Sequence, residues 1–246
     1  MIIGSNLIFY ETLSSTNITA SLLLKEKDLQ EGTVITTDFQ TAGKGQPGYR
    51  WESEKGKNLL ISIILYPESV NPDEQFLIFM SISLGICDFT GRYFQGSRIK
   101  WPNDIYIHNN KIAGILIENS ILGDKIENSV AGIGFNVNQV KFDPVIPNPA
   151  SLKMITGKDH DTDACLKQLL SDLDKRYIQL LYGDRESIRN EYSSLLYRSG
   201  EWYNYRSTGT VFKGKIINVS TSGKLMIKVK NGSIREFSFK EVDYIQ

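Results

Sequence analysis

The sequence predicts an α+β protein in which a larger N-terminal domain precedes a small antiparallel β-barrel. Three observations favour this fold class. The apolar stretch at residues 58–65, NLLISIIL, is typical of a central buried strand. Leucines from Leu166 onward recur at intervals of three and four, which predicts an amphipathic helix. After Gly200 the chain consists of β-branched segments separated by glycines, a pattern typical of a small barrel. We expect the domains to span residues 1–198 and 199–246.

Local patterns place the remaining elements in order along the chain. The SSTN sequence at residues 14–17 supplies possible N-caps to a first helix that extends to about residue 27. The HNN sequence at residues 108–110 predicts a hairpin turn. Residues 40–57 are polar and glycine-rich, which indicates a long loop. The other strands are expected at residues 7–10, 33–37, 98–101, 105–108, 111–118 and 129–138, and the other helices at residues 72–93 and 185–196.

Composition and charge argue against some classes of protein. A hydrophobic share of 41% and a charged share of 23% are ordinary for a soluble globular protein. The net charge of zero argues against a general binder of nucleic acid or membrane surfaces. From Gly200 onward, however, eight lysines and arginines outnumber four acids. The two cysteines lack a CxxC spacing, no apolar run approaches the ~20 residues that span a bilayer, and the N-terminus lacks a signal-peptide pattern. We therefore expect a cytoplasmic protein with buried free thiols.

The loop sequence GKGQPGYRW combines glycines with two cationic side chains. Gly43, Gly45 and Gly48 let backbone N–H groups crowd around an anion. Lys44 and Arg50 supply the compensating positive charge. The segment matches neither the P-loop motif nor the GxGxxG dinucleotide motif. It predicts either an anion-binding loop or a mobile surface loop.

Two further motifs join strands to polar or small residues. In KWPND, which begins at Lys100, Asn103 and Asp104 either hold a turn or belong to a functional site at a strand end. In KIAGILIE, Lys111 either extends to solvent or supplies the positive charge of a ligand site. Gly114 in the same strand lets a ligand or a neighbouring backbone come close.

The GIGFNVN motif alternates glycine with apolar residues. Gly132 and Gly134 weaken a strand unless something packs against the bare backbone. Asn136 and Asn138 either satisfy buried polar groups or end the strand. The SSTN sequence at residues 14–17 is either an N-cap or a set of polar groups that suits a ligand at a helix N-terminus. The two histidines stand apart, and the sequence shows no metal-ligand cluster.

Taken in order, the motifs SSTN, QTAGKGxxGxxW, KWPND, KIAGILIE and GIGFNVN resemble those of the bacterial biotin–protein ligases. They cover residues 14–138, and the barrel-like tail follows. The resemblance implies a mixed β-sheet with helices on one side, the class II synthetase-like catalytic fold, and then an SH3-like barrel. It also implies a two-step reaction. Biotin's carboxylate attacks the α-phosphate of Mg-ATP, and an acceptor lysine then attacks the resulting biotinyl-5′-adenylate and releases AMP.

The resemblance also implies roles for individual residues. Those expected around the ring system of biotin are Ser15, Thr16, Asn17 and Gln40. Those expected in the loop that closes over the adenylate are Gly43, Lys44, Gly45, Arg50 and Trp51. Those expected along the rest of the pocket are Lys100, Asn103, Gly114, Gly132, Gly134 and Asn136, the last near the adenine. Lys111 is expected to hold the carboxyl oxygen and the phosphate. The chemistry adds one role: the acceptor amine must be neutral to attack, and Asp104 is the candidate base.

Elementary chemistry agrees with these roles. Carboxylate and phosphate repel each other, so their reaction needs a fixed cation, for which Lys44 and Lys111 are the candidates. The ureido group of biotin needs paired donors and acceptors, which suits neutral polar side chains. Many members of the family carry GRGRRGRxW, whereas here Lys44 replaces an arginine, and Gln46, Pro47 and Tyr49 replace other residues. Lysine cannot bind phosphate bidentately, so we expect the contact to differ in detail.

The resemblance implies ATP with its bound Mg²⁺ as cofactor, biotin as substrate, and a biotin carboxyl carrier domain of a carboxylase or decarboxylase as partner. Because SSTN begins at residue 14, we expect no N-terminal helix-turn-helix and no binding of operator DNA. We expect no membrane partner either, and the sequence leaves a monomer and a homodimer equally open.

Two other functions remain open at the level of sequence. Lipoate ligases and octanoyl transferases share the catalytic fold, although they carry an RRxxGGG-type run and lack KWPND. The basic barrel at residues 213–240 is alternatively a module that binds RNA or protein. Its aromatic residues fit the core of a small barrel as well as a stacking surface for bases.

Overall fold

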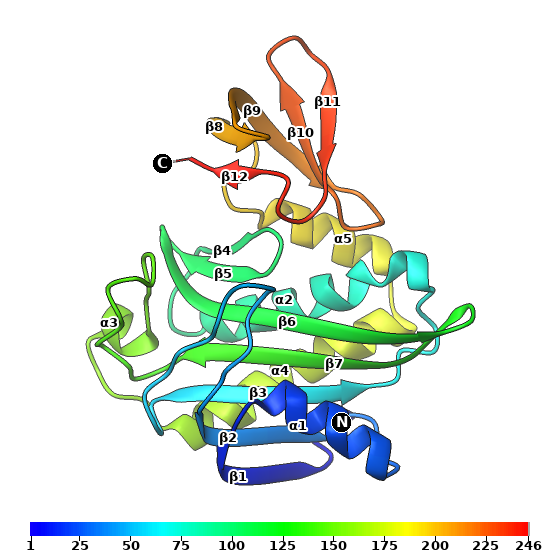
Figure 1. Cartoon of the computed structure of the whole chain (residues 1–246), viewed down its shortest axis with the longest axis vertical. Helices are drawn as coiled ribbons and strands as arrows, with labels where there is room; N and C mark the ends of the chain where they lie inside the picture. Colours follow the sequence, from blue (N-terminus) through cyan, green and yellow to red (C-terminus); the bar gives the residue numbers. More distant parts are fainter. Residues whose placement is uncertain (246) are drawn as a thin grey trace.

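Residues 1–245 are described by the computed structural model, and they form two β-sheets with helices around the larger one (Figure 1). The larger sheet has seven strands in the order β1-β2-β3-β7-β6-β5-β4. β1 and β2 are parallel, whereas the other neighbouring pairs are antiparallel. This mixed sheet confirms the predicted fold class. Its strands are β1 Leu7–Leu13, β2 Val34–Gln40, β3 Asn58–Leu65, β4 Ser97–Lys100, β5 Asp104–Ile107, β6 Asn110–Leu122 and β7 Lys125–Asn136.

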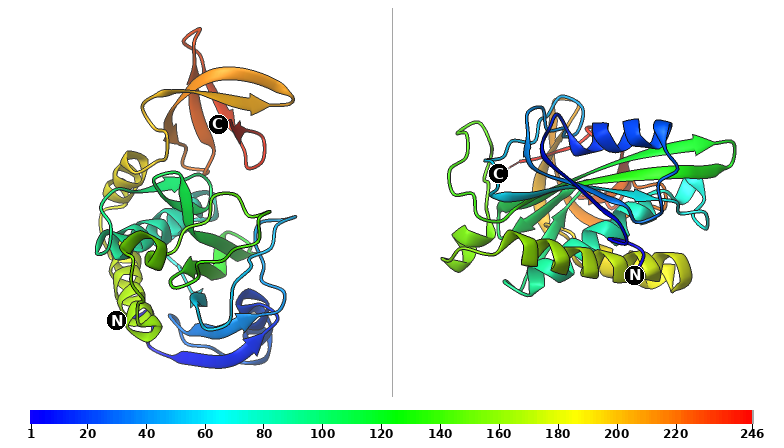
Figure 2. Two further views of the ribbon diagram at one scale, coloured as in Figure 1. Left: turned by 90° about the vertical axis from the view of Figure 1, so that its left-hand side faces the viewer. Right: turned by 90° about the horizontal axis from the view of Figure 1, so that it is seen from below.

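Helices cover both faces of this sheet (Figure 2). The side chains of β3 alternate between the faces: Ile61 and Ile63 belong to the large core beneath α2 and α4, whereas Ile64 packs with Ala20 of α1. The two longest helices therefore lie on one face, as the resemblance implies, and α1 lies on the other. The helices are α1 Thr16–Glu26, α2 Phe76–Gly91 after a 3-10 turn at Pro72–Glu74, α3 Leu152–Thr156, α4 Thr162–Tyr182 and α5 Arg185–Ser194.

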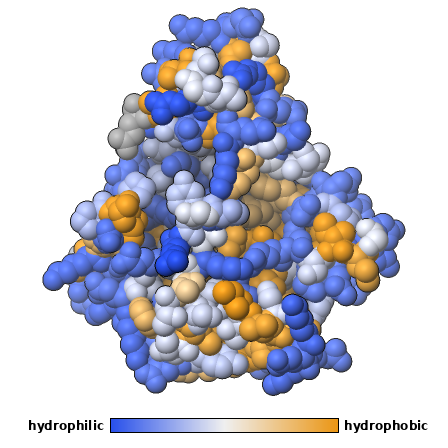
Figure 3. Space-filling model, in the orientation of Figure 1, coloured by the Kyte–Doolittle hydropathy of each residue, from blue (hydrophilic) through white to orange (hydrophobic). Residues whose placement is uncertain are grey.

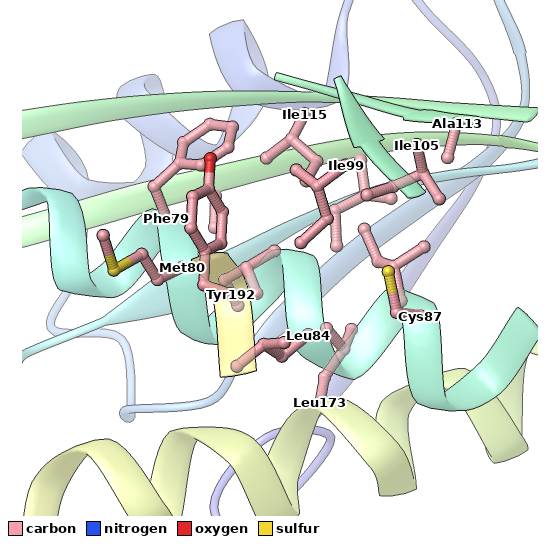
Figure 4. Close-up of a cluster of buried hydrophobic side chains, with 14 of the residues drawn as sticks. Phe79, Met80, Leu84, Cys87, Ile99, Ile105, Ala113, Ile115, Leu173 and Tyr192 are labelled. Atoms are coloured by element: carbon pink, nitrogen blue, oxygen red, sulfur yellow. The ribbon is translucent and has the colours of Figure 1, made fainter. Parts of the chain in front are cut away.

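The large core is built around α2, which lies between the sheet and α4 (Figure 4). Nearly every residue of this helix from Leu77 to Thr90 is buried, so α2 lacks the polar stripe of a surface helix. Gly85 allows α4 to approach, because a Cβ there would lie 2.9 Å from the Cα of Leu173. This packing places α2 and α4 over one face of the sheet and leaves its other face to α1 and the loops.

A second sheet of five antiparallel strands lies at one end of the molecule, beside β4, β5 and α5 (Figure 1). Its order is β11-β10-β9-β8-β12, with β11 and β12 at the edges. The predicted boundary at residue 198 lies between α5 and β8, although the buried core runs on through Leu196, Tyr205 and Ile216. Separate folding of two domains stays a prediction. The strands are β8 Trp202–Ser207, β9 Thr210–Val219, β10 Leu225–Val229, β11 Ile234–Phe237 and β12 Asp243–Tyr244.

The hairpin of β6 and β7 is longer than the sequence predicts. β6 continues to Leu122 and β7 begins at Lys125, so the two strands project beyond their neighbours. Except for the buried Ile126, the added residues, among them Asn119 and Ser120, are polar or exposed, and the lack of a regular apolar alternation conceals the strand. Among residues 1–245, no helix is both long enough and apolar enough to cross a membrane.

The two thiols should be unreactive in the folded protein. Cys87 in α2 and Cys165 in α4 are both free and buried. Burial raises the pKa of Cys87 to about 12 and also raises the pKa of Cys165, so little of either is the reactive thiolate at pH 8. We expect a colorimetric thiol reagent at pH 8 to modify neither cysteine in native buffer and both in denaturant. Rapid stoichiometric modification of the native protein would contradict this assignment.

Candidate active site

A cavity of about 690 Å³ lies on the α1 side of the seven-stranded sheet. It is bounded by the N-terminus of α1, the glycine-rich loop after β2, strands β6 and β7, the loop after β7, and the turn between β11 and β12. In Figure 3 apolar side chains lie deep between the C-terminal sheet and the body of the molecule. The lining includes five lysines and arginines against three carboxylates, Glu52, Asp104 and Asp243. The cavity therefore favours an anionic ligand with apolar parts.

Sixteen of the seventeen residues singled out from the sequence line this cavity, and Gly43 does not. Gly43 instead lies where the loop folds back on itself: its carbonyl accepts from the Trp51 N–H at 3.0 Å. A Cβ at Gly43 would lie 2.3 Å from the Trp51 carbonyl oxygen, so this close approach needs a glycine. Gly43 thus shapes the loop rather than the cavity wall.

Sequence reasoning missed two parts of the wall. The loop after β7 contributes apolar residues, and its three prolines gave no periodic signal from which to place it. The C-terminal sheet contributes residues whose position depends on contacts far apart in the sequence. These two groups are Phe142, Val145, Ile146, Pro147 and Pro149, and Phe239, Lys240, Val242, Asp243 and Tyr244.

Thr16 and Asn17 of the SSTN sequence belong to a buried polar network, and no side chain of SSTN caps α1. Ser15 occupies the N-cap position, but its side chain makes no capping hydrogen bond. Gln40 supplies the acceptor instead: its Oε1 accepts from the Thr16 backbone N–H at 2.8 Å. The Ser62 hydroxyl lies 2.8 Å from Thr16 Oγ1 and 2.6 Å from Asn17 Oδ1. These contacts fix the Gln40 amide with its Nε2 as the remaining donor.

Glu118 joins this network to the glycine-rich loop. Its Oε2 accepts from Asn17 Nδ2 at 2.8 Å, and its Oε1 lies 3.1 Å from Lys44 Nζ. Asn17 also donates to the carbonyl of Leu116 and accepts from Ser62, so both ends of its amide are occupied. Asn17 therefore holds the pocket together more than it offers free polar groups. Glu118 is the last residue of KIAGILIE, but its odd spacing of seven from Lys111 predicts opposite faces of a regular strand, so the sequence pattern did not indicate it.

Trp51 lies on bare backbone in the middle of the sheet. A Cβ at Gly134 would lie 2.3 Å from the indole ring, and one at Gly114 would lie 3.0 Å from it. Gly132 likewise lets Asn17 approach the strand, because the Oδ1 of Asn17 would lie 2.1 Å from a Cβ at this position. The three glycines therefore admit two side chains that lie directly on the strands. The ammonium of Lys111 lies 5.5 Å from the centre of the indole ring.

Lys111 and Asp104 form an ion pair in the lining of the cavity. Lys111 Nζ lies 2.7 Å from Asp104 Oδ1, and both side chains are mostly buried. Nearby, Lys100 donates to the Tyr106 hydroxyl at 3.0 Å. Burial raises the pKa of Tyr106 to about 12, with the charge of Asp104 acting in the same direction. Burial also raises the pKa of Tyr244. Both phenols therefore stay neutral at physiological pH and add no negative charge to the cavity.

Two asparagines of the predicted site have different surroundings. Asn103 Nδ2 donates to the carbonyl of Ile115 at 3.2 Å, which anchors the KWPND turn to β6. Asn136 is only 4% exposed; its Nδ2 donates to the Ala150 carbonyl at 2.9 Å. Its Oδ1 is buried and has no hydrogen-bond partner among the described residues. A buried acceptor without a partner is costly, so Asn136 suits a ligand that brings a donor.

Comparison with known proteins shows the family to which the chain belongs. The model of the biotin/lipoate A/B protein ligase family matches residues 9–136, more than half of the chain and most of the cavity wall. The chain belongs to this family. It is 30% identical over 245 residues to the bifunctional ligase/repressor BirA of Bacillus subtilis, an alignment that covers 96% of this chain and 74% of that protein. The resemblance to biotin–protein ligases that the sequence motifs indicated is therefore confirmed.

Two further relatives extend the comparison. The biotin–[acetyl-CoA-carboxylase] ligase of Mycobacterium tuberculosis is 27% identical over 153 residues, which cover 61% of this chain and 55% of that protein. The crystal structure of the Aquifex aeolicus biotin protein ligase in complex with biotin and ATP matches with a TM-score of 0.79 at 26% identity. It covers 97% of this chain and 98% of that one. The fold is that of a biotin–protein ligase, including the C-terminal sheet.

Removing the charge of Glu118 should loosen the glycine-rich loop. Glu118→Gln keeps an acceptor for Asn17 but removes the counter-ion of Lys44. A partly exposed ion pair contributes about 0.2–1 kcal/mol, so we expect tryptic cleavage at Lys44 and Arg50 to become roughly 1.5- to 5-fold faster. Glu127→Gln, an exposed carboxylate in β7 with no ion pair among the described residues, is the matched control. Equal cleavage rates in both variants and the wild type would rule out the coupling.

Proposed function

We propose that this biotin–protein ligase works in the two steps that its cavity suits. The carboxylate of biotin attacks the α-phosphate of ATP to give biotinyl-5′-adenylate and pyrophosphate. The amine of an acceptor lysine then attacks the mixed anhydride, forms the amide and releases AMP. One observation carries this proposal: a neutral polar pocket, two lysines and an apolar wall with an unpaired acceptor line one continuous cavity.

The neutral pocket at the start of α1 is the proposed site for the ureido ring of biotin. Ser15, Thr16 and Gln40 line it, and it contains hydroxyls and an amide but no charge at its centre. The Oε1 of Gln40 is held by Thr16, so its Nε2 is available as a donor to the ureido oxygen. Asn17, which the sequence placed beside biotin, positions this group through Ser62 and Glu118.

Lys111 and Lys44 are the proposed cations between the two reacting anions. Each is paired with a carboxylate, Asp104 or Glu118, in the structure. An incoming carboxylate and phosphate compete with these partners, and the lysines then reduce the repulsion between biotin and ATP. When Lys111 binds the ligand, its ion pair with Asp104 is broken. The freed Asp104 carboxylate is the proposed base for the acceptor amine in the second step.

The loop after β7 and Asn136 are the proposed site for adenine. Phe142, Val145 and Ile146 offer an apolar surface to a flat base. The unpartnered Oδ1 of Asn136 fits the exocyclic amine of adenine as a donor. No group of three or more His, Cys, Asp or Glu side chains able to hold a metal ion occurs within residues 1–245. We propose that Mg²⁺ enters as the complex with ATP and is held mainly by the phosphates.

The proposed acceptor is the biotin carboxyl carrier domain of a biotin-dependent carboxylase. The relative from Mycobacterium tuberculosis is named for acetyl-CoA carboxylase, which supports this class of acceptor. The direct test is to incubate the protein with ATP, biotin and a purified carrier domain and to probe the carrier with streptavidin. We expect labelling that needs all components and releases AMP and pyrophosphate in equal amounts. Attachment of lipoate in place of biotin would overturn the proposal.

Lys111→Ala should impair the first step, and Asp104→Asn should impair the second. A charge-assisted contact to a buried anion is worth about 1.5–3 kcal/mol, so we expect biotin-dependent pyrophosphate exchange to fall roughly 10- to 150-fold in Lys111→Ala. Asp104→Asn should retain exchange and lose transfer from preformed adenylate to the carrier. Lys125→Ala, an exposed lysine at the start of β7, serves as the control. If both cavity variants lose only thermal stability, the ion pair is structural and the roles are wrong.

The glycine-rich loop should become ordered when biotin and ATP bind together. Ordering a residue costs roughly 1–2 kcal/mol, and residues 41–57 contain four glycines. The adenylate offers Lys44 a phosphate and offers Trp51 an apolar surface, and closure protects the anhydride from water. We expect trypsin to cut at Lys44, Arg50, Lys55 and Lys57 quickly in the free protein and slowly with biotin plus Mg-ATP. ATP alone should give little protection; identical rates in all three conditions would exclude closure.

A further inference from the structure

The cations of the C-terminal sheet are not paired with carboxylates. Of the twenty lysines and arginines before residue 200, nine form an ion pair, whereas none of the eight after it does so among the described residues. Two of the four acids in this part of the chain accept hydrogen bonds from neutral donors, and a third, Asp243, lines the cavity. The local excess of positive charge is therefore not neutralised within the protein.

Strands β8 to β11 direct alternate side chains to an inner and an outer face of this sheet. The inner face carries Tyr205, Ile216 and Phe237, and all three are buried. The two aromatic rings therefore belong to the core and offer no stacking surface. On the outer face lies Trp202, which is 42% exposed and has no aromatic neighbour among the described residues. This face thus combines unpaired cations with one free indole ring.

One row of side chains crosses the outer face from β8 to β11. Trp202 is opposite Lys215, Lys215 is opposite Lys228, and Lys228 is opposite Ile234. Neighbouring strands lie about 4.8 Å apart, so the two lysines are side by side and the indole lies next to them. Like charges directly opposite each other destabilise a sheet. This pair of lysines is therefore unfavourable in the free protein, and a bound anion would remove the repulsion.

Further cations lie beside this row. Lys213 is two positions before Lys215 on β9 and is opposite Asn204, and Arg206 lies further along β8. Glu236 of β11 is the one carboxylate among the described residues of the outer face. None of these side chains lines the active-site cavity, and the hairpin of β10 and β11 extends away from the large sheet (Figure 1). The basic face is therefore separate from the proposed sites for biotin and ATP.

The arrangement of these groups favours a single-stranded nucleic acid over other anions. The cations are spread over several strands, which suits the repeated phosphates of a polymer better than one small anion. An exposed indole beside them offers a stacking surface to an unpaired base, which a duplex or an acidic peptide does not present. The amide of Asn204, opposite Lys213, adds a hydrogen-bonding group within reach of a ribose 2′-hydroxyl. These features together fit RNA.

We propose that the outer face of β8 to β11 binds single-stranded RNA. Its phosphates contact Lys213, Lys215 and Lys228, and one base stacks on Trp202. This activity goes beyond the ligase reaction, because the surface lies outside the cavity. The zero net charge of the whole chain agrees with it, since the compensating excess of acids lies before residue 200. The binding is local to the C-terminal sheet.

Fluorescence anisotropy with a labelled oligouridylate of about 12 nucleotides, a length within the site sizes of small β-barrels, tests this proposal. Three or four phosphate contacts predict that log K falls with log salt concentration with a slope of about −2 to −3. The double variant Lys215→Gln/Lys228→Gln should bind about tenfold more weakly, with a slope smaller by about 1.4. Its thermal unfolding temperature should equal or exceed that of the wild type, because a repulsive pair is removed. Trp202→Ala should weaken binding roughly 5- to 150-fold and leave the slope unchanged.

The matched control is Lys125→Gln/Lys167→Gln, which removes two exposed lysines of β7 and α4 that form no ion pair among the described residues. Its affinity for the oligouridylate should equal that of the wild type, and all variants should biotinylate a carrier domain at the wild-type rate. Equal affinities of the wild type and Lys215→Gln/Lys228→Gln would overturn the proposal. Tighter binding of a polyglutamate peptide would assign the surface to an acidic protein instead. Equally tight binding of an oligodeoxythymidylate of the same length would contradict RNA as the partner.

Discussion

Three glycines on β6 and β7 let other parts of the chain touch the backbone of the sheet. Gly132 admits the amide of Asn17, while Gly134 and Gly114 admit the indole of Trp51. A single methyl group at Gly132 or Gly134 would overlap these side chains, because its distance to them would be 2.3 Å or less. The start of α1 and the glycine-rich loop could not then lie where they do. The polar pocket, the loop and the position of Lys44 all depend on this bare strip of strand.

Two lysines of the cavity are paired with carboxylates, and the proposed function requires a ligand to replace these partners. Lys111 with Asp104 and Lys44 with Glu118 are close, and the first pair is mostly buried. A buried lysine without a partner would be costly, so the carboxylates stabilise the cations within the folded protein. The carboxylates also weaken the attraction of each lysine for a single incoming anion. Two anions that bind together compete for both lysines at once, which favours binding of biotin and nucleotide in one complex.

Much of the fold follows from local pattern, and much of the site does not. The apolar run of β3 and the leucine spacing of α4 predict their elements because each pattern reflects burial at the same place in the chain. The glycines at 132 and 134 predict a close approach, but the partners Asn17 and Trp51 come from distant segments. Glu118 and Lys240 were missed for the same reason: each is an ordinary surface residue until its contact 74 or 193 positions away is known. Ser15 of SSTN does occupy the N-cap position of α1, but the capping acceptor comes from Gln40 of β2, which no local pattern predicts.

The contacts at the two ends of the cavity join residues that differ greatly in their separation along the sequence. One contact of the polar pocket joins Thr16 to Gln40, 24 positions apart within the unit of β1, α1 and β2, although the contacts to Ser62 and Glu118 span 46 and 101 positions. The opposite wall needs a residue that pairs across nearly the whole chain. Short-range contacts close with less loss of chain entropy and form early, whereas long-range ones wait for the rest of the polypeptide. During synthesis the contact between Thr16 and Gln40 can thus form while the ribosome is still translating, whereas the wall formed by the C-terminal sheet is completed only after that sheet has emerged.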